Sequence, residues 1–166
     1  MRRTVIGVMG PAAAGEALEK AAYELGRLIA EEGWVVLTGG RDCGVMDAAS
    51  RGAKSVGGST TVGILPDDYR AGEISDAVDI AIFTAMGDAR NAINVQSSDV
   101  VIACGAATPG TLSEVALALK VEKHVVVLGA GPEGRQFLSV CGGDRIHFAD
   151  TAADAVAQVR RLLAAL

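Results

Sequence analysis

The chain has 166 residues, of which 50% are hydrophobic and 4% aromatic, and its formal net charge is −5. A chain of this length can bury a sizeable core, and we expect a single domain over residues 1–166. Scattered basic residues and few aromatics argue against nucleic acid as a partner. No apolar run approaches the roughly 20 residues that cross a bilayer, and we recognise no signal peptide, so we expect a cytoplasmic protein without membrane contact.

Short apolar runs alternate with longer amphipathic segments along the chain. The short runs predict strands at 5–9, 34–38, 61–65, 79–83, 100–104, 125–128 and 145–148. The amphipathic segments predict helices at 16–32, 44–56, 88–98, 111–121, 133–140 and 151–166. Residues 67–78 are polar and predict a long loop, and Thr151 with Asp154 has the spacing of a helix cap at the last helix.

This alternation, with strands that are apolar throughout, predicts a parallel sheet with helices on both faces. Right-handed crossovers then produce a doubly wound, Rossmann-like α/β fold. In such a fold, ligands bind beyond the carboxyl ends of the strands, at a topological switch point. The glycine-containing turns that precede helices lie on that edge and are the first places to look for a site.

Cysteine and histidine patterns predict no metal site. Cys43, Cys104 and Cys141 form no CxxC pair, and the two histidines lack a ligand-like spacing. The chain therefore predicts neither a zinc site nor a disulfide framework. Cys104 ends an apolar run and is expected to be a small buried residue. For Cys43, in a glycine loop, a reactive thiol is the alternative to a structural role.

The first turn, residues 10–15 with the sequence GPAAAG, excludes several common nucleotide-binding modes. It is not G-x-G-x-x-G, and the second strand ends in Thr38-Gly39-Gly40 rather than in an acidic residue, so NAD binding in its usual mode is not expected. The chain has no G-x-x-x-x-G-K-[ST] motif, which excludes a P-loop NTPase. It also lacks G-x-S-x-G, and neither histidine suits a catalytic triad.

The second turn runs from Thr38 through Gly39, Gly40 and Arg41 to Gly44 and Met46. Its glycines could simply relieve crowding in a tight strand-to-helix connection. Alternatively, they allow the backbone to approach a ligand and form one wall of a cleft. The turn that follows the strand at 100–104 favours the second interpretation.

That later turn contains Gly105, Thr108, Gly110 and Thr111. Such a turn aims backbone N–H groups and the positive end of a helix dipole at one point, which suits an anion and most often a phosphate. Glu114 follows one turn inside the helix.

Arg90, from the preceding helix, would add a cation to this carboxylate and anion cradle. The alternatives are structural. Thr111-Leu112-Ser113-Glu114 matches a capping box, in which Glu114 would only stabilise the helix start. Arg90 could be a solvated helix residue.

Motifs in order along residues 5–128 resemble the LOG-like (SLOG) superfamily and, within it, the branch of the molybdenum cofactor carrier proteins. The segments that carry the resemblance are Thr38-Gly39-Gly40, Gly44-Val45-Met46, Gly52-Ala53, Gly57-Gly58, Val62-Gly63-Ile64-Leu65-Pro66, Ala89-Arg90-Asn91, Ser98-Asp99 and Gly110-Thr111-Leu112-Ser113-Glu114. LOG enzymes are phosphoribohydrolases that cut the N-glycosidic bond of nucleoside 5′-monophosphates. The carriers bind a pterin cofactor through its phosphate. Nothing in the chain marks the pyridoxal phosphate site that the "lysine decarboxylase" label of some relatives implies.

The resemblance implies roles for individual residues. Gly110 and Thr111 would bind phosphate, Glu114 would face the sugar, and Arg90 would face the ligand across the cleft. Glu114 and Arg90 would be the catalytic pair of an enzyme. The further ligand-binding residues that it implies are Gly10, Gly39, Gly40, Arg41, Gly44, Met46, Asn91, Gly105 and Thr108.

Two departures from the LOG pattern favour a binding or carrier protein over a hydrolase. LOG enzymes have Pro-Gly-Gly-x-Gly-Thr-x-x-Glu, whereas residues 105–111 read GAATPGT, with Ala106 and Ala107 in place of the paired glycines. The Arg-Lys pair of LOG enzymes is Arg90-Asn91, which removes a cation. We therefore expect a phosphorylated small-molecule ligand, with the molybdenum cofactor as a candidate cargo. N-glycosidic hydrolysis is the alternative.

The resemblance also implies a homodimer or a higher homo-oligomer. The predicted helix at 111–121 has little polarity beyond Ser113, Glu114 and Lys120, although a helix covering a sheet should have a polar side. The apolar residues in question are Ala116, Leu117 and Leu119 beside Ile93 and Val95. Alternatively, all of these face the sheet.

Overall fold

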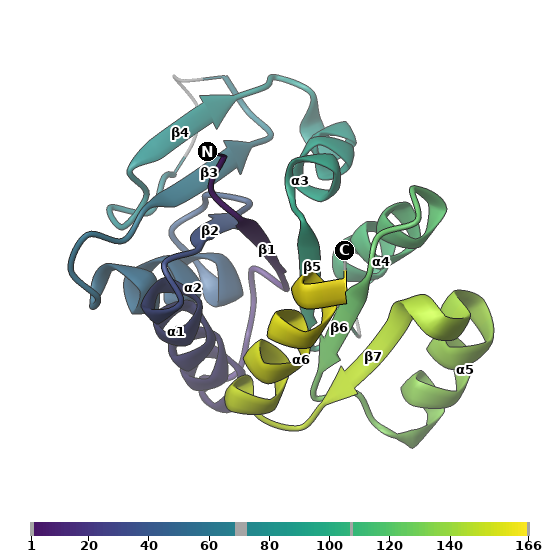
Figure 1. Cartoon of the computed structure of the whole chain (residues 1–166). Coiled ribbons are helices and arrows are strands. Elements are labelled where there is room, and N and C mark those ends of the chain that lie inside the picture. The colour runs from purple at the N-terminus through teal and green to yellow at the C-terminus, as the bar shows by residue number, and fades with distance from the viewer. Residues whose placement is uncertain (1, 69–72, 107, 166) are drawn as a thin grey trace.

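The structure, a computed structural model, describes residues 2–68, 73–106 and 108–165. Within these residues, seven parallel strands form one sheet in the order β4-β3-β2-β1-β5-β6-β7 (Figure 1). The strands are β1 (Val5–Met9), β2 (Val35–Thr38), β3 (Thr61–Leu65), β4 (Ile80–Phe83), β5 (Val100–Cys104), β6 (Val125–Leu128) and β7 (Ile146–Ala149). The helices are α1 (Glu16–Glu31), α2 (Gly44–Lys54), α3 (Asn91–Ser97), α4 (Pro109–Lys120), α5 (Pro132–Gly142) and α6 (Ala152–Ala165), with 3₁₀ turns η1 (Gly87–Arg90) and η2 (Gly143–Arg145).

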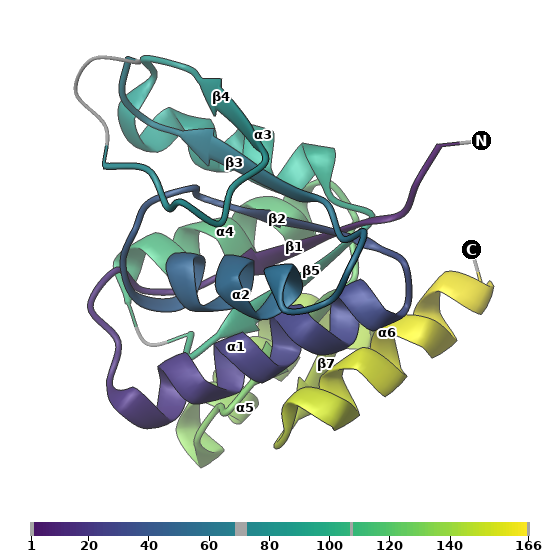
Figure 2. The same ribbon diagram turned by 90° about the vertical axis from the view of Figure 1, so that its left-hand side faces the viewer.

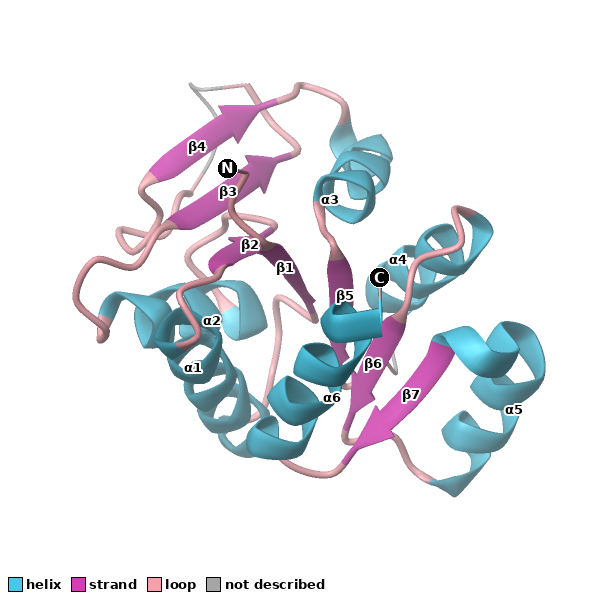
Figure 3. Cartoon of the chain, in the orientation of Figure 1, coloured by secondary structure: helices cyan, strands magenta, loops and turns pink. Residues whose placement is uncertain are grey.

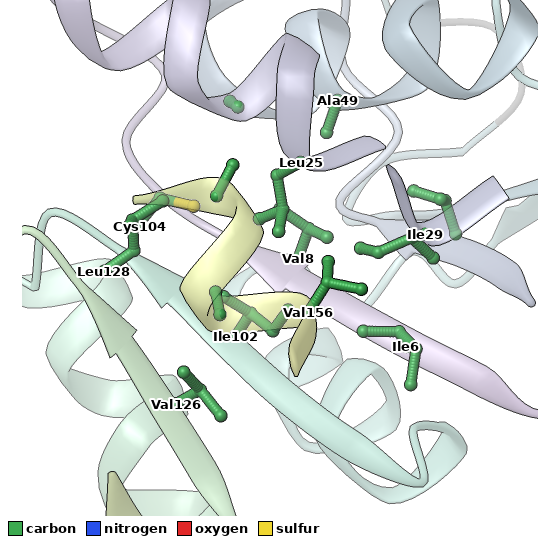
Figure 4. Close-up of a cluster of buried hydrophobic side chains, with 14 of the residues drawn as sticks. Ile6, Val8, Leu25, Ile29, Ala49, Ile102, Cys104, Val126, Leu128 and Val156 are labelled. Carbon is green, nitrogen blue, oxygen red and sulfur yellow. The ribbon is translucent and has the colours of Figure 1, made fainter. Parts of the chain in front are cut away.

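Helices cover both faces of the sheet, as predicted: α1, α2 and α6 lie on one face and α3, α4 and α5 on the other (Figures 1 and 3). Because alternate residues of a strand point to opposite faces, each central strand contributes to two cores. In β5, Ile102 and Cys104 pack under α1, α2 and α6 (Figure 4), whereas Val101 and Ala103 pack under α3, α4 and α5. The doubly wound, Rossmann-like α/β fold is thus confirmed.

The helices α1 and α2 lie side by side with their backbones in close contact (Figure 2). A Cβ on Gly26 would lie 1.9 Å from the Ala49 carbonyl oxygen, and a Cβ on Gly52 would lie 1.9 Å from the Tyr23 carbonyl oxygen. Glycine at both positions lets the helices approach until side chains no longer separate them. This contact holds α2, and therefore the turn that precedes it, in a defined place.

Four predicted strands match the structure to the residue, namely β1, β3, β5 and β6. The predicted helix at 88–98 begins as the 3₁₀ turn η1 and becomes α-helical only at Asn91. The strand predicted from residue 145 begins at Ile146, because η2 occupies the preceding residues. The last helix is capped as expected, since Thr151 Oγ1 accepts a hydrogen bond from the Asp154 N–H at 3.1 Å.

None of the described helices is long and apolar enough to cross a membrane. Cys104 is fully buried, as expected, and burial raises the pKa of its thiol to about 12. The pKa of the Cys43 thiol is also raised, mainly by burial and then by the charge of Asp42, which argues against a reactive thiol there.

Candidate functional site

A cleft of about 380 Å³ opens at the carboxyl ends of β1, β2, β3 and β5. The chain passes outward from β1 to β4 and returns to β5 on the other side of β1, so the cleft lies at the topological switch point. Its volume is within the range of small-molecule sites. The lining residues are Val8, Met9, Gly10, Pro11, Ala12, Ala13, Gly39, Arg41, Met46, Pro66, Asp88, Arg90, Asn91, Thr108, Gly110, Thr111 and Glu114.

The amino-terminal end of α4 forms one wall of the cleft. The helix begins at Pro109, and its N-cap is Thr108, whose side chain accepts a hydrogen bond from the Thr111 N–H at 3.5 Å. The fixed φ of proline suits the first helical position. The N–H groups of the first turn have no acceptor within the helix, so Gly110 can offer its N–H to an anion in the cleft.

The structural alternative for Glu114, a capping box with Thr111, is therefore wrong. Thr111 already lies inside the first turn of α4, three residues after the true N-cap, Thr108. Glu114 consequently lies in the second turn, beyond reach of the N-cap N–H. Of the two alanines expected to reshape this turn, Ala107 lies outside the described residues.

Glu114 is buried at the wall of the cleft, with 7% of its surface exposed. Its Oε1 accepts a hydrogen bond from Asn94 Nδ2 at 2.9 Å. Burial raises the pKa of this carboxyl, and the Asn94 hydrogen bond and the charge of Arg90 only partly oppose that effect. The neutral form of Glu114 is thus favoured more than in an exposed glutamate.

Arg90 lies across the cleft and is half-buried, so its interpretation as a solvated helix residue is wrong. Its Nη1 donates a hydrogen bond to the Ile64 carbonyl oxygen at 2.7 Å, and its Nε is buried without a partner among the described residues. Burial lowers the pKa of the guanidinium, and the charge of Glu114 opposes this shift. A Cβ on Gly39 would lie 2.3 Å from Nη1, so glycine at this position makes room for the arginine.

Two other polar residues of the wall, Arg41 and Asn91, are paired. Arg41 Nη2 lies 2.6 Å from Asp67 Oδ2 in an ion pair. Asn91 Nδ2 donates to Ser113 Oγ at 3.1 Å, which links α3 to α4 beside the anion cradle. The cleft therefore contains two guanidinium groups, Arg41 and Arg90, on the side opposite the start of α4.

The structure brings ten of the thirteen predicted site residues to the wall of this cleft: Gly10, Gly39, Arg41, Met46, Arg90, Asn91, Thr108, Gly110, Thr111 and Glu114.

It does not bring Gly40, Gly44 and Gly105 there. All three have positive φ angles, of 77°, 54° and 59° respectively. A Cβ on Gly44 would also lie 2.3 Å from the Pro11 carbonyl oxygen. These glycines shape the turns, whereas Gly39 shapes the cleft.

Several residues that line the cleft or lie directly behind its wall were not identified from the sequence. Asn94, which holds Glu114, follows Arg90 by four residues, and this spacing places two side chains on one helix face. That signal could have identified Asn94. The cleft is also lined by Asp88, Pro66 and the alanines of the first turn. Their position depends on the path of the backbone between strands and helices, and no sequence motif predicts it.

The fold and the position of the cleft are those of Rossmann-like proteins with a ligand site at the switch point. Within that class, the chain belongs to the SLOG cluster4 family, whose model matches residues 3–160. An uncharacterized protein from Archaeoglobus fulgidus is 46% identical over 128 residues, which are 77% of this chain and 82% of that protein.

Two solved structures are similar over nearly the whole chain. The molybdenum cofactor binding protein from Rippkaea orientalis is 48% identical with a TM-score of 0.93, covering 98% of this chain and 99% of that chain. The molybdenum cofactor carrier protein from Chlamydomonas reinhardtii is 49% identical with a TM-score of 0.92, again covering 98% of this chain and 99% of that chain. The resemblance predicted from the sequence motifs is confirmed.

Proposed function

We propose that the chain binds the molybdenum cofactor, a phosphorylated pterin, in the cleft at the carboxyl ends of the strands and carries it unchanged. The observation that carries this proposal is the meeting of three features at one cleft: the start of α4, the half-buried Arg90 and the buried Glu114–Asn94 pair. The two solved relatives, a molybdenum cofactor binding protein and a molybdenum cofactor carrier protein, support it.

The residues present fit such a cargo. The first turn of α4, with Gly110 and Thr111, would hold the phosphate, because the N–H of Gly110 and the helix dipole favour an anion there. Two buried polar atoms lack partners among the described residues, the donor Arg90 Nε and the acceptor Asn94 Oδ1. Arg90 lines the cleft, and a phosphorylated pterin carries acceptors that could satisfy its Nε.

Cofactor retention tests the proposal directly. Cofactor released from a denatured molybdoenzyme under anaerobic conditions is mixed with the protein, which is then separated by gel filtration. We expect molybdenum and oxidised-pterin fluorescence to co-elute with the protein near one equivalent per chain. Arg90→Ala should retain less, and Glu133→Gln, a change in the first turn of α5 outside the cleft, should retain as much as the wild type. Elution of the cofactor apart from the wild-type protein would refute the proposal.

The second candidate function is hydrolysis of nucleoside 5′-monophosphates. A buried carboxyl in the cleft, Glu114, opposite a cation, Arg90, favours it. Such a carboxylate could stabilise positive charge at an anomeric carbon. Incubation of the apoprotein with a panel of monophosphates, followed by chromatographic detection of free base, tests this activity. Release of base by a clean preparation would reverse the ranking of the two functions.

We also propose a homodimer or higher homo-oligomer. Of the residues considered, Val95 is fully buried, and Ile93, Leu117 and Leu119 pack partly against the core, so the sheet accounts for much of their apolar character. The support that remains is Leu112 and Val121, which are 39% and 42% exposed at the two ends of α4. Light scattering at micromolar concentration measures the mass, and a monomeric value contradicts the proposal.

A further inference from the structure

Asn94 is a fully buried amide that is only half satisfied. It lies on α3, one helical turn after Arg90. Its Nδ2 donates to Glu114 Oε1, but its Oδ1 is buried without a partner among the described residues. A buried polar atom without a hydrogen bond is costly, and its retention calls for a functional explanation.

Glu114 is likewise short of partners for an ionised group. Among the described residues, the hydrogen bond from Asn94 is the one that this carboxyl accepts. No ion pair joins it to Arg90 among the described residues, because Arg90 Nη1 is directed to the Ile64 carbonyl oxygen. A buried carboxylate with a single hydrogen bond is unfavourable, whereas a neutral carboxyl is not.

The other charged groups at the cleft do not compensate a carboxylate fully. Arg90 from η1 is the cation that faces Glu114, and it also lies in the field of Asp88 on the same turn. Arg41, from the turn after β2, is paired with Asp67. The net positive charge available to Glu114 is therefore small, and a bound anion would compete for it.

We infer that Asn94 positions Glu114 so that its neutral carboxyl donates a hydrogen bond to the anionic group of the ligand, and that ligand binding takes up a proton at any pH where Glu114 is ionised in the free protein. The inference rests on the proposed function, since it requires an anion in the cleft. Asn94 holds Oε1 as an acceptor, which leaves Oε2 to carry the proton. The proton comes from solvent on binding and returns to solvent on release, and no covalent bond changes.

Either orientation of the Asn94 amide can form a hydrogen bond with neutral Glu114. As described, the Nδ2 donor meets Oε1 of the acid. Exchange of the two amide atoms, which is an assignment rather than an observation for any asparagine, would place Oδ1 against Glu114. Only a protonated Glu114 could then donate to it. An ionised Glu114 beside a bound phosphate would instead repel it at short range in a poorly screened site.

Proton uptake makes ligand affinity depend on pH. Anion binding should be tightest where Glu114 is protonated in the free protein, and should weaken as the pH rises above its pKa. The carrier would then bind its cargo more tightly at lower pH and release it more readily at higher pH. Asn94 acts through Glu114 and is a positioning residue.

A titration with sulfate tests the inference, because sulfate stays a dianion from pH 5 to pH 8 and contributes no proton of its own. Affinity is measured from the amide signals of Gly110 and Thr111 by NMR, and the protonation of Glu114 from its side-chain ¹³C carboxyl signal. We expect wild-type affinity to be at least ~10-fold higher at pH 5 than at pH 8. The affinity of Glu114→Gln should be nearly independent of pH. Asn94→Ala should shift the pH dependence to higher pH, because it removes a hydrogen bond that favours ionised Glu114. Glu133→Gln should behave as the wild type.

The outcomes separate this inference from the proposed function. If sulfate moves neither amide signal at any pH, the anion site at α4 is wrong, and the inference is overturned with it. If sulfate binds equally well at pH 5 and pH 8, the proposed function stands and the inference is overturned. Retention of the full pH dependence by Glu114→Gln would also overturn it, because Asp67 or Asp88 would then be the responsible carboxylate.

Discussion

Gly39→Ala is a one-methyl perturbation that tests whether the position of Arg90 matters for ligand binding. The added Cβ would lie 2.3 Å from Arg90 Nη1 and 2.6 Å from Met46 Sδ. Ordinary van der Waals contact begins near 3.4 Å. The end of the Met46 side chain can rotate away, but the guanidinium is anchored to the Ile64 carbonyl oxygen at 2.7 Å.

The magnitude follows from that anchor. To restore contact distance, the guanidinium must move by about 1 Å, which breaks a hydrogen bond from a charged donor. Such bonds contribute about 1.5–3 kcal/mol. The displaced guanidinium would also lose a hydrogen bond of this kind to the ligand. Since 1.4 kcal/mol corresponds to a tenfold change in affinity, we expect Gly39→Ala to weaken cofactor binding by roughly 10- to 100-fold.

Cofactor retention on anaerobic gel filtration, with a thermal melt of each variant, measures this effect. Gly57→Ala is the matched control, because a Cβ at Gly57 meets nothing within 4 Å. If Gly39 acts through Arg90, the double variant with Arg90→Ala binds no more weakly than Arg90→Ala alone. Wild-type retention by a folded Gly39→Ala, or an equal loss in Gly57→Ala, would refute the reasoning.

Three further predictions address stability and chemistry. Gly52→Ala should lower the free energy of unfolding by about 1–3 kcal/mol, because its Cβ would collide with the Tyr23 carbonyl oxygen. This cost should exceed the gain from the better helix propensity of alanine. Denaturant unfolding of Gly52→Ala, with Gly57→Ala as the control, measures the difference. Because the pKa of Glu114 is raised in the folded state, the folded protein holds this proton at pH values where the unfolded chain has lost it. The ionisation of Glu114 therefore destabilises the fold as the pH rises. The melting temperature of Glu114→Gln relative to wild type should therefore increase from pH 5 to pH 8, and a difference that is constant with pH would contradict this. If the chain hydrolyses nucleoside monophosphates, Glu114→Gln should lower the rate at least ~100-fold, and an unchanged rate would remove Glu114 from the chemistry.

The sheet and the place of the cleft could be predicted because both depend on local signals. A strand buried on both faces appears as a continuous apolar run, and Gly or Pro ends it, as Pro66 ends β3. Once the strands are known to be parallel, their carboxyl ends share one edge. The turns after β1, β2 and β5 then have to meet there, and the cleft follows from topology.

The start of α4 was mispredicted because two N-cap signals overlap in the sequence. Thr111 with Glu114 has the capping-box spacing, but Thr108 precedes a proline, which fits the first helical position. The proline decides between them, since it also removes an N–H that would need a partner. The sequence Thr108-Pro109 therefore already indicated the correct helix start. The capping-box spacing of Thr111 and Glu114 was coincidental.

The environment of Glu114 could not be predicted from local signals. Its partner Asn94 is twenty residues away in sequence, and the pairing depends on how α3 packs against α4. The contact of His124 Nδ1 with His147 Nε2, at 3.1 Å, is of the same kind. It arises because β6 and β7 are neighbours in the sheet. Both contacts join residues that are far apart in the sequence. They depend on strand register and on helix packing, which local sequence patterns do not predict.

The protonation of Glu114 bears on the choice between carrier and hydrolase. A hydrolase of N-glycosidic bonds needs negative charge beside the developing cation at the anomeric carbon, and a neutral carboxyl supplies little of it. A carrier needs groups that hold an anion without reacting with it, and a neutral carboxyl that donates a hydrogen bond does so. Burial of Glu114 and the diversion of Arg90 to the Ile64 carbonyl oxygen favour the neutral state, and the Asn94 hydrogen bond only partly opposes it. A hydrolase would need Glu114 as a negatively charged carboxylate. In this cleft, the neutral carboxyl is better suited to binding and releasing an anionic ligand.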